Sequence, residues 1–519
     1  MTVLRTTTIP VPFLLAIILI FISAITATQD PPTFFDASEN RQHPFSSTDN
    51  GRRPVIGPSA LPSLRNDRAG GRCLSERLVV SEKLGLEIMV ESGASIFVDE
   101  NRNLVHAARD FGLTFEEDDD DSRLLDAHLG GSIIVNATKS EAEAASAMQV
   151  SIWNGTHTLF MVDLDGGWRS KFRGRLADAA AAKMSQVYSP GHRSYKSVDK
   201  LVDGLGLREE TRVRMSEYVE RMGINKRWAD EVLEGVTRVN YGRDLSEVHV
   251  LAALAGFVKG PTYSVREGNQ RIYEEFLGRS KARTYFNSTV TSIHPSSLPL
   301  ADGYQITYTD TSTGQSTNST SAYDTIVLAL PPTASGLSAI SLPMNSTPIP
   351  ATPYHQVHVT FVLGKLNLTT FPNRPVQVLT TKSVKFIQSV SLVYDFGYQL
   401  ADYGVGLYKV FSTVSLTYDG PWMRQLFSRV DKVWRRQWFA YPVMRPEQRN
   451  EKGFFGPLTV HEMRIREGKE RKARVHYLNG MERMMSTMET ATVASRNLVR
   501  VLVDEVLGED GIKVGIARD

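Results

Sequence analysis

Hydrophobic residues recur with two different periods along this chain, and the two periods together predict a mixed α/β fold. Apolar positions three and four residues apart predict helices. Such patterns occupy residues 101–111, 138–148, 175–187, 208–221, 226–235, 246–256, 270–278 and, at greater length, 481–507. Short β-type runs alternate with them. One of these runs, Thr325 to Leu330, ends at two prolines and is typical of a strand buried on both faces of a parallel sheet.

The pattern changes beyond residue 350, where β-type runs follow one another without helices between them. Gly, Asn, Asp and Pro separate these runs, as expected for turns between strands. The runs cover residues 357–363, 376–380, 384–393 and 406–416. This region is therefore predicted to form a second, β-rich lobe. Farther on, the charged stretch Glu462 to Arg474 is predicted to be either a surface loop or an error in the reading frame.

Length and charge narrow the classes of function. A chain of 519 residues is long enough for two or three large lobes, so a single small binding module is excluded. Lys and Arg number 59 against 57 Asp and Glu, and this balance provides no basic field for nucleic acid. The 11 histidines form no metal-ligand motif, and no Gly-x-Ser-x-Gly motif is present. We therefore predict no metal site and no serine hydrolase.

The N-terminus and the sequons predict the secretory pathway. Val11 to Ile25 is a mostly apolar run that follows Arg5, and small residues surround Ala27. We interpret residues 1–27 as a cleaved signal peptide, because 15 residues are short for a stable transmembrane anchor. The Pro-rich residues 28–54 are predicted to be a disordered linker. Six sequons are candidate glycosylation sites, at Asn136, Asn154, Asn287, Asn318, Asn345 and Asn367.

One of these sequons lies in a predicted hairpin. Asn154-Gly155 separates two β-type runs, Gln149 to Trp153 and Thr156 to Val162, so Asn154 is expected at an exposed turn. With one cysteine, Cys73, the chain cannot form an intramolecular disulfide. A secreted, vacuolar or lysosome-like glycoprotein stabilised by its packed interior is the predicted class.

Three glycine-containing segments carry the candidate chemistry. The first, Arg65 to Arg72, contains Gly70-Gly71-Arg72, in which glycine lets the backbone approach a ligand and arginine can pair with a phosphate. The second, Val90 to Ser95, contains Glu91 and Gly93. The third, Tyr477 to Glu482, places Asn479, Gly480 and Glu482 just before a helix, whose free amides attract anions.

In their order and spacing these segments resemble the prenylcysteine oxidases, flavin enzymes of the secretory and lysosomal route, and their fungal branch in particular. The resemblance extends over residues 65–505. It includes further segments at Arg238 to Gly242, Ser264 to Asn269, Tyr323 to Pro332 and Trp438 to Pro442.

The resemblance implies an FAD/NAD(P)-binding Rossmann-like α/β flavoprotein with an amine-oxidase-like architecture of two lobes. It implies an FAD-dependent oxidase that cleaves S-prenylcysteine with O2 to cysteine, a prenyl aldehyde and H2O2. Gly70, Gly71 and Arg72 would then lie along the FAD phosphates and ribityl chain, Glu91 and Gly93 in the next contact loop, and Asn479, Gly480 and Glu482 at the flavin. Tyr241 and Trp438 are candidate substrate-lining residues, with burial in the core as the alternative. Asn269 is expected to cap the helix that begins at Gln270.

The resemblance also divides the chain into regions. They are an incomplete FAD-binding lobe (55–165), a helical part of the substrate lobe (166–240), a continuation of the FAD lobe (241–335), the β-rich substrate lobe (336–445) and a C-terminal FAD-binding segment with its helix (446–519).

The sequence departs from this pattern at the first βαβ unit. Pro54 to Gly57 resembles its opening strand, but only seven residues, Pro58 to Leu64, separate Gly57 from Arg65. A βαβ unit needs about 30 residues, so the Gly-x-Gly-x-x-Gly turn and its helix have no room. Either the reading frame lacks an exon or the chain is truly shorter. Two alternative functions therefore stay open, a secreted flavin amine oxidase and a glycoprotein that has lost its cofactor.

Overall fold

The computed structural model describes eleven segments of the chain. They are residues 55–56, 68–115, 149–163, 177–189, 192–257, 262–298, 302–332, 336–372, 374–396, 404–465 and 472–507. The predicted signal peptide, the whole predicted linker, the predicted helix at 138–148 and Asn136 lie outside these segments. No helix in the segments above is long and apolar enough to cross a membrane.

A seven-stranded sheet forms the larger β layer, in the order β16-β12-β15-β14-β13-β5-β6. Its strands are β5 Gln149–Trp153, β6 Thr158–Asp163, β12 Tyr354–Leu366, β13 Gln377–Thr380, β14 Ile387–Asp395, β15 Gly406–Ser412 and β16 Phe427–Pro442. All pairs are antiparallel except β13 with β5. The predicted β-rich region is confirmed. The long strand β16 was not expected, because charged residues interrupt its apolar pattern at this edge of the sheet.

The predicted hairpin around Asn154 is confirmed, since β5 and β6 pair on either side of it. This hairpin precedes the β-rich region by about two hundred residues, yet β5 joins the same sheet through β13. The sheet therefore combines two regions that the sequence placed in different lobes. The lobe boundaries themselves stay predictions.

A four-stranded sheet has the order β1-β11-β18-β17, with β1 Val55–Ile56, β11 Thr325–Leu328, β17 Thr459–Arg464 and β18 Lys472–Tyr477. Strand β11 pairs in parallel with both β1 and β18, as its unbroken apolar run predicted. The prediction that Glu462 to Arg474 is a loop was wrong at both of its ends, because β17 and β18 pair there as antiparallel strands. Ion pairs from Glu462 to Lys472 and Arg474 let charged residues occupy this edge.

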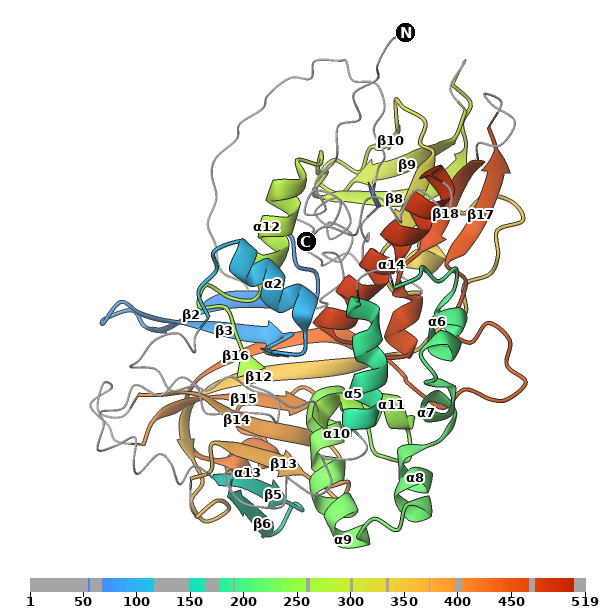
Figure 1. The fold of residues 1–519 in the computed structure, drawn as a ribbon. Coiled ribbons are helices and arrows are strands. Elements are labelled where there is room, and N and C mark those ends of the chain that lie inside the picture. The colour runs from blue at the N-terminus through green and yellow to red at the C-terminus, as the bar shows by residue number, and fades with distance from the viewer. Residues whose placement is uncertain are drawn as a thin grey trace.

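Three smaller sheets complete the β structure. Strands β2 Leu74–Ser81 and β3 Leu86–Gly93 form a hairpin, and β4 Phe97–Val98 pairs with β7 Thr262–Tyr263. Strands β8 Ser288–Pro295, β9 Tyr304–Asp310 and β10 Ser316–Asn318 form an antiparallel sheet. Figure 1 shows the β2–β3 hairpin lying between α2 and the seven-stranded sheet.

The helices follow the predicted pattern with differences at several boundaries. They are α2 Arg102–Asp110, α5 Ala177–Ser185, α6 Val198–Gly204, α7 Arg208–Arg212, α8 Met215–Arg221, α9 Lys226–Trp228, α10 Glu234–Tyr241, α11 Val250–Leu254, α12 Gln270–Ser280, α13 Pro421–Leu426 and α14 Met488–Leu507. Single turns of 3-10 helix are η3 Gln186–Tyr188, η5 Ala255–Phe257, η6 Leu337–Ala339 and η7 Asn479–Arg483. A π-helical turn, η4 Ala229–Leu233, joins α9 to α10.

Two predicted helices are divided or shortened. The pattern at 208–221 gives α7 and α8, because Val213 and Arg214 are extended and Arg214 forms a bridge with His249. The pattern at 246–256 gives the shorter α11, which His249 caps by accepting the amide of Ala252 at 3.2 Å. Each break arises from a tertiary contact that periodicity cannot reveal.

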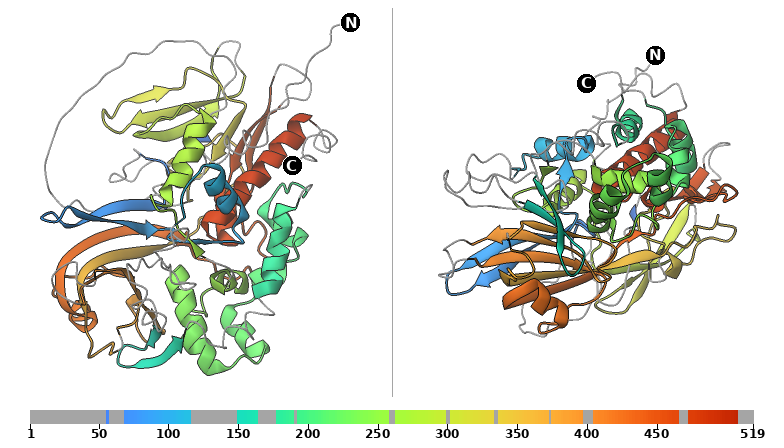
Figure 2. Two further views of the ribbon diagram at one scale, coloured as in Figure 1. Left: turned by 60° about the vertical axis from the view of Figure 1, so that its left-hand side comes forward. Right: turned by 90° about the horizontal axis from the view of Figure 1, so that it is seen from below.

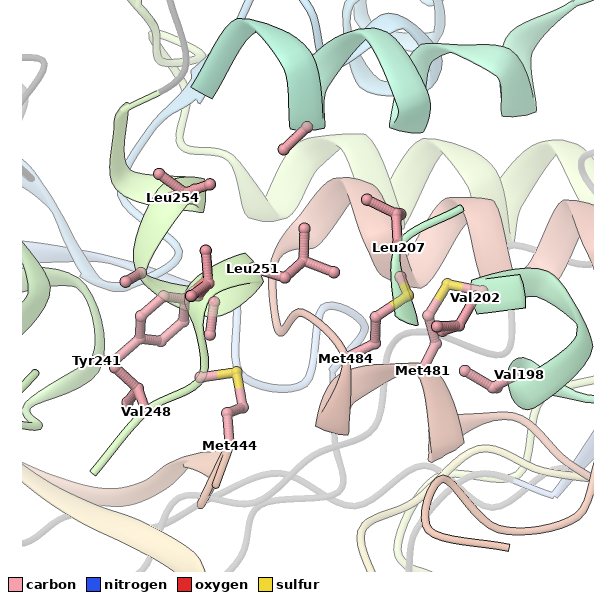
Figure 3. Packing of buried hydrophobic residues seen from close by; sticks show 14 of the residues in the cluster. Val198, Val202, Leu207, Tyr241, Val248, Leu251, Leu254, Met444, Met481 and Met484 are labelled. Carbon is pink, nitrogen blue, oxygen red and sulfur yellow. The ribbon is translucent and has the colours of Figure 1, made fainter. Parts of the chain in front are cut away.

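The hydrophobic core joins the helical region to the C-terminal segment. Met481 and Met484, in and just after η7, lie beside Val202 and Leu207 of the helical region (Figure 3). Farther along the chain, α14 packs beside α2 (Figures 1 and 2). The turn η7 thus packs against the helical region, and the helix α14 that follows it packs against α2. The predicted α/β class is confirmed.

Candidate functional site

The Gly-Gly-Arg turn adopts a conformation that requires glycine. Gly70 and Gly71 have φ of +102° and +54°, in the left-handed region. A Cβ atom on Gly70 would lie 2.7 Å from the carbonyl oxygen of Cys73 and 2.9 Å from Cγ of Gln270. The chain therefore turns sharply just before β2, and Arg72 enters the interior there.

Arg72 forms a buried ion pair with Glu482 of η7. Their side chains are only 16% and 9% exposed. Arg72 also donates to the carbonyl of Ala440, while Glu482 accepts the Tyr354 hydroxyl at 2.8 Å and the Asn479 amide at 2.6 Å. Arg72, Tyr354, Ala440, Asn479 and Glu482 are called the Arg72 cluster below. It connects the first and third predicted segments to strands β12 and β16.

Tyr354 is a residue of this cluster that the sequence did not single out. Burial, and then the negative charge of Glu482, hold the pKa of its phenol well above the usual range. Tyr354 therefore stays protonated and acts as a hydrogen-bond donor to Glu482. Its position at the start of an ordinary apolar strand gave no signal in the sequence.

The second predicted segment is held by Glu91 and Asn269. The Glu91 carboxylate accepts the Ser75 hydroxyl at 2.8 Å and the Asn269 amide N–H at 2.7 Å. The side chain of Asn269 donates to the carbonyls of Ala94 and Ser95, both at 2.9 Å. Asn269 is the N-cap residue of α12, as predicted, but its side chain makes no capping hydrogen bond because its amide is bound to Ala94 and Ser95 instead.

Gly93 brings the second segment against Trp438. A Cβ atom on Gly93 would lie 2.3 Å from Cη2 of Trp438 and 2.7 Å from the Arg72 carbonyl oxygen. Trp438 is half-buried, and its Nε1 is buried with no hydrogen-bond partner among the residues that the structure describes. A predicted cofactor loop and a predicted substrate-lining residue are therefore in direct contact.

Gly480 also lies where no side chain fits. A Cβ atom there would be 2.5 Å from the carbonyl oxygen of Phe455. This close packing fixes the backbone of η7 next to Asn479, whose amide oxygen is buried and unpartnered within the described part of the chain. His249 holds the same turn, with its Nε2 3.1 Å from the carbonyl oxygen of Arg483.

Tyr241 lies in the core of the helical region. It is 4% exposed, and its ring meets that of Tyr441 edge to face at 5.3 Å between centroids. Figure 3 shows Tyr241 beside Val248, with Met444 near both. The structure therefore places Tyr241 among core residues, while Gly70, Arg72, Gly93, Trp438 and Glu482 converge on one place.

Glu489 is a further buried charged group that sequence reasoning missed. It lies at the start of α14 and accepts the backbone N–H groups of Asn103 and Leu104 at 3.0 and 3.1 Å. Its carboxylate therefore accepts hydrogen bonds from the free N–H groups in the first turn of α2 and lies at the positive end of that helix. Burial raises the pKa of Glu489 to about 7. An isolated glutamate in the first turn of an apolar helix was its only sequence signal.

Comparisons with known proteins identify the family of this chain. A family model described as prenylcysteine lyase matches residues 174–510. The chain belongs to this family. The resemblance of the chain to prenylcysteine oxidases is thus confirmed. The match includes Tyr241, Trp438 and the Asn479 to Glu482 turn, whereas the first two glycine segments precede it.

Several curated proteins are similar to this chain over part of their length. Mouse prenylcysteine oxidase 1 is 27% identical over 331 residues, 60% of this chain and 61% of that protein. Human prenylcysteine oxidase 1 is 27% identical over 337 residues, with the same shares. Farnesylcysteine lyase from Arabidopsis thaliana is 23% identical over 335 residues, 61% of this chain and 58% of that protein. The match therefore spans less than two thirds of each relative.

Solved structures with a similar arrangement include two amine oxidases. Cyclohexylamine oxidase from Brevibacterium oxydans covers 85% of this chain and 92% of its own, at 12% identity and a TM-score of 0.48. A putrescine oxidase covers 84% and 92%, at 10% identity and a TM-score of 0.42. At these TM-scores we base no argument on either protein.

The orphaned polar atoms of the site test whether its residues suit a flavin. The Asn479 amide oxygen can accept a hydrogen bond and the Trp438 indole N–H can donate one, and both are buried without partners in the part of the chain described. A planar heterocycle with donors and acceptors on its edge carries both kinds of partner. Arg72 and Glu482 already satisfy each other. The residues present thus fit the polar edge of a flavin, while the predicted gap between Gly57 and Arg65 lies outside the described residues.

Proposed function

We propose that this chain is an FAD-dependent oxidase that cleaves the thioether of S-prenyl-L-cysteine in the degradation of prenylated proteins. O2 accepts two electrons and water supplies the aldehyde oxygen, so that the products are cysteine, a prenyl aldehyde and H2O2. The Arg72 cluster is the observation that carries the proposal, because it joins the first and third glycine segments in one buried place. The family membership and the names of the relatives support the same reaction class.

The chain's own residues bind and orient in this proposal. Bound FAD would supply the chemistry, by accepting hydride from the prenyl carbon next to sulfur. Asn479 and Trp438 would meet the polar edge of the flavin with their unpartnered atoms. Arg72 and Glu482 fix the backbone around that edge rather than contacting it with free charges.

The glycine segments complete the proposed cofactor site. Gly70 and Gly71 would let the turn before β2 pass close to the ribityl chain and phosphates. Glu91 and Gly93 would form the second contact loop, which Asn269 holds in place. Gly480 would set the backbone of the third, where packing against Phe455 leaves no room for a side chain.

An absorption spectrum of the purified protein tests the cofactor, and a peroxide assay tests the reaction. We expect flavin bands, and formation of peroxide and farnesal when S-farnesylcysteine and O2 are added. Cyclohexylamine and putrescine serve as control substrates and should give no peroxide. A colourless protein would overturn the proposal for this chain and favour a glycoprotein that has lost its cofactor.

The amine-oxidase alternative is not favoured, because the matching family model is that of prenylcysteine lyase. Peroxide formed from the two amines and not from the thioether would restore it.

The proposal also includes a secreted, vacuolar or lysosomal location and glycosylation, on the basis of the predicted signal peptide and sequons. Asn287, Asn318 and Asn345 are exposed, and Asn154 and Asn367 are half-buried.

A further inference from the structure

The seven-stranded sheet has two different faces. Val362, Val378, Val390, Tyr408 and Val410 lie on one face, in a single apolar cluster that also contains residues of α13. The other face, called the inner face here, carries Val359, Phe361, Leu379 and Phe411 and packs against the β2–β3 hairpin and the helical region. The inner face is thus directed toward the centre of the molecule.

Lys409 of β15 lies on this inner face. It pairs across the sheet with Phe361 of β12 and with Ser391 of β14, and directly opposed residues share a face. Its Nζ lies close to the ring of Phe411, 5.2 Å from the centroid. Lys409 is therefore a charged residue on a face that carries mostly apolar side chains, together with the polar Ser389, Ser391 and Gln377.

Lys409 is buried without a charged partner. It is 4% exposed, and its Nζ donates to the Ser95 hydroxyl at 2.7 Å and to the Glu91 carbonyl at 3.4 Å. Within the described residues no carboxylate lies at ion-pair distance from Nζ. Burial of an ammonium group is costly unless it is paired, so this position favours an anion.

Two hydroxyl groups beside Lys409 are also unsatisfied. Ser389 and Ser391 are 0% and 2% exposed, and in the structure as described neither hydroxyl has a hydrogen-bond partner. Both lie on the inner face, since they alternate along β14 and Ser391 opposes Lys409. Phe411 and Trp438 on the same face are half-buried. The result is a group of polar side chains, Lys409, Ser389 and Ser391, within a layer that also carries apolar and aromatic residues.

Lys409 lies next to the proposed cofactor site. Glu91 and Ser95, which accept its hydrogen bonds, lie at the end of β3 and just after it, and Gly93 at the end of the same strand contacts Trp438. Ala94, which follows this strand, has a φ of +57°, a strained value for a residue with a side chain. Residues 91–95 thus connect Lys409 to the proposed cofactor site, because Ser95 binds Lys409 and Gly93 contacts Trp438.

We propose that Lys409 binds the α-carboxylate of the S-prenylcysteine substrate, with the hydroxyls of Ser389 and Ser391 as further donors, and thereby determines the specificity for a free amino acid. This inference rests on the oxidase function proposed above. A prenylcysteine carries one anionic group on an otherwise apolar or cationic molecule, and Lys409 is a buried cation with no carboxylate of the described residues at ion-pair distance.

The acid and its methyl ester test the proposal directly. We expect Lys409→Met to lower kcat/KM for S-farnesylcysteine by about 10- to 100-fold, the range for a hydrogen bond to a charged group, and to leave the methyl ester nearly unaffected. Lys432→Met is the matched control, because Lys432 is an exposed lysine of the same sheet. It should leave both substrates unchanged. Equal losses for acid and ester in Lys409→Met would overturn the proposal.

A measurement on the unaltered protein covers the case in which Lys409→Met does not fold. Burial lowers the pKa of Lys409 to about 8, against the opposing effect of Glu91, which is the charged group that acts on it. We expect KM for the acid to rise above about pH 8, while KM for the ester does not rise in step. Ser391→Ala should raise KM for the acid several-fold without changing kcat. A pH-independent KM ratio between acid and ester would contradict the proposal.

Two further outcomes separate this proposal from the proposed function. If Lys409→Met loses bound flavin instead of its preference for the acid, Lys409 serves the cofactor and the proposal is wrong. If the protein binds flavin but oxidises neither substrate, the oxidase function is wrong. In that case the thermal midpoint of the protein is measured with and without S-farnesylcysteine. A rise of the midpoint that Lys409→Met abolishes supports the carboxylate site. If S-farnesylcysteine does not change the midpoint of the unaltered protein, the proposal for Lys409 is wrong too.

Discussion

Arg72 and Glu482 are 410 positions apart in the sequence and form a buried ion pair. The pair lies where the Gly-Gly-Arg turn and η7 meet strands β12 and β16. Each partner has additional hydrogen bonds, so both buried charges are stabilised by neutral groups as well as by each other. This pair determines how the C-terminal turn η7 lies against the Gly-Gly-Arg turn.

Removal of one partner of this pair is expected to destabilise the protein. Glu482→Ala leaves the Arg72 guanidinium buried and uncompensated, with an expected loss of about 3–5 kcal/mol in the free energy of unfolding. Asp230→Ala, which breaks the exposed Lys226–Asp230 pair, is the control and should cost less than about 1 kcal/mol. Urea unfolding of both variants gives the comparison. Equal losses would show that the buried pair has no special role.

Gly93 should not tolerate even a methyl group. Gly93→Ala places Cβ within 2.3 Å of Trp438, so the indole must move or the loop must shift. We expect a lower thermal midpoint together with a changed Trp438 fluorescence, and partial recovery of the midpoint in Gly93→Ala/Trp438→Leu. Gly278→Ala is the control, since nothing lies within 4 Å of a Cβ there and alanine favours the helix. A Gly93→Ala variant as stable as the control would contradict the packing.

Stability should decrease from near-neutral to alkaline pH because of two buried carboxyl groups. Burial, and for Glu234 also the charge of Asp244, raises the pKa of Glu234 to about 8, and burial raises that of Glu489 to about 7. Unfolded glutamate has its pKa near 4.5, so the folded state holds these protons more tightly. The stabilisation is complete below pH 4.5 and is lost as the pH rises toward 8.

The measurement is the thermal midpoint between pH 6.5 and pH 8.5. Each carboxyl contributes at most about 1.4 kcal/mol per pH unit in its own window. Glu234→Gln and Glu489→Gln should each flatten the decline, whereas Glu217→Gln, at an exposed position, should not. His249, His355 and His476, whose pKa burial lowers to about 4, act in the opposite direction below pH 6.5. An unchanged slope in both Gln variants would refute this origin.

Glycans are expected first at the exposed sequons. Asn287 and Asn345 lie in left-handed turns and Asn318 in an exposed edge strand, so their amides are accessible. Asn154 accepts the amides of Thr156 and His157 at 3.0 and 2.8 Å, which leaves its amide nitrogen for modification. Mass spectrometry after enzymatic deglycosylation locates the modified residues. An unmodified protein from a eukaryotic secretory host would contradict the proposed compartment.

Local pattern was a good guide where a segment depends on its own residues. The strand at Thr325, the hairpin around Asn154 and the helix at 270 follow from apolar spacing and turn chemistry, and the structure has them. The same reasoning failed for β17 and β18, where ion pairs between neighbouring strands stabilise a charged edge. It also failed for β16, an edge strand with many charged residues.

The sequence by itself determined the α/β class, the order of the glycine segments and the resemblance to prenylcysteine oxidases, because these depend on residue type and spacing along the chain. Only the tertiary structure decided that Gly93 faces Trp438, that Tyr241 belongs to the core, and that Lys409 is buried beside two unsatisfied hydroxyls. Burial and hydrogen-bond satisfaction are properties of neighbours in space. Residues that are hundreds of positions apart, such as Arg72 and Glu482, become neighbours only when the chain has folded.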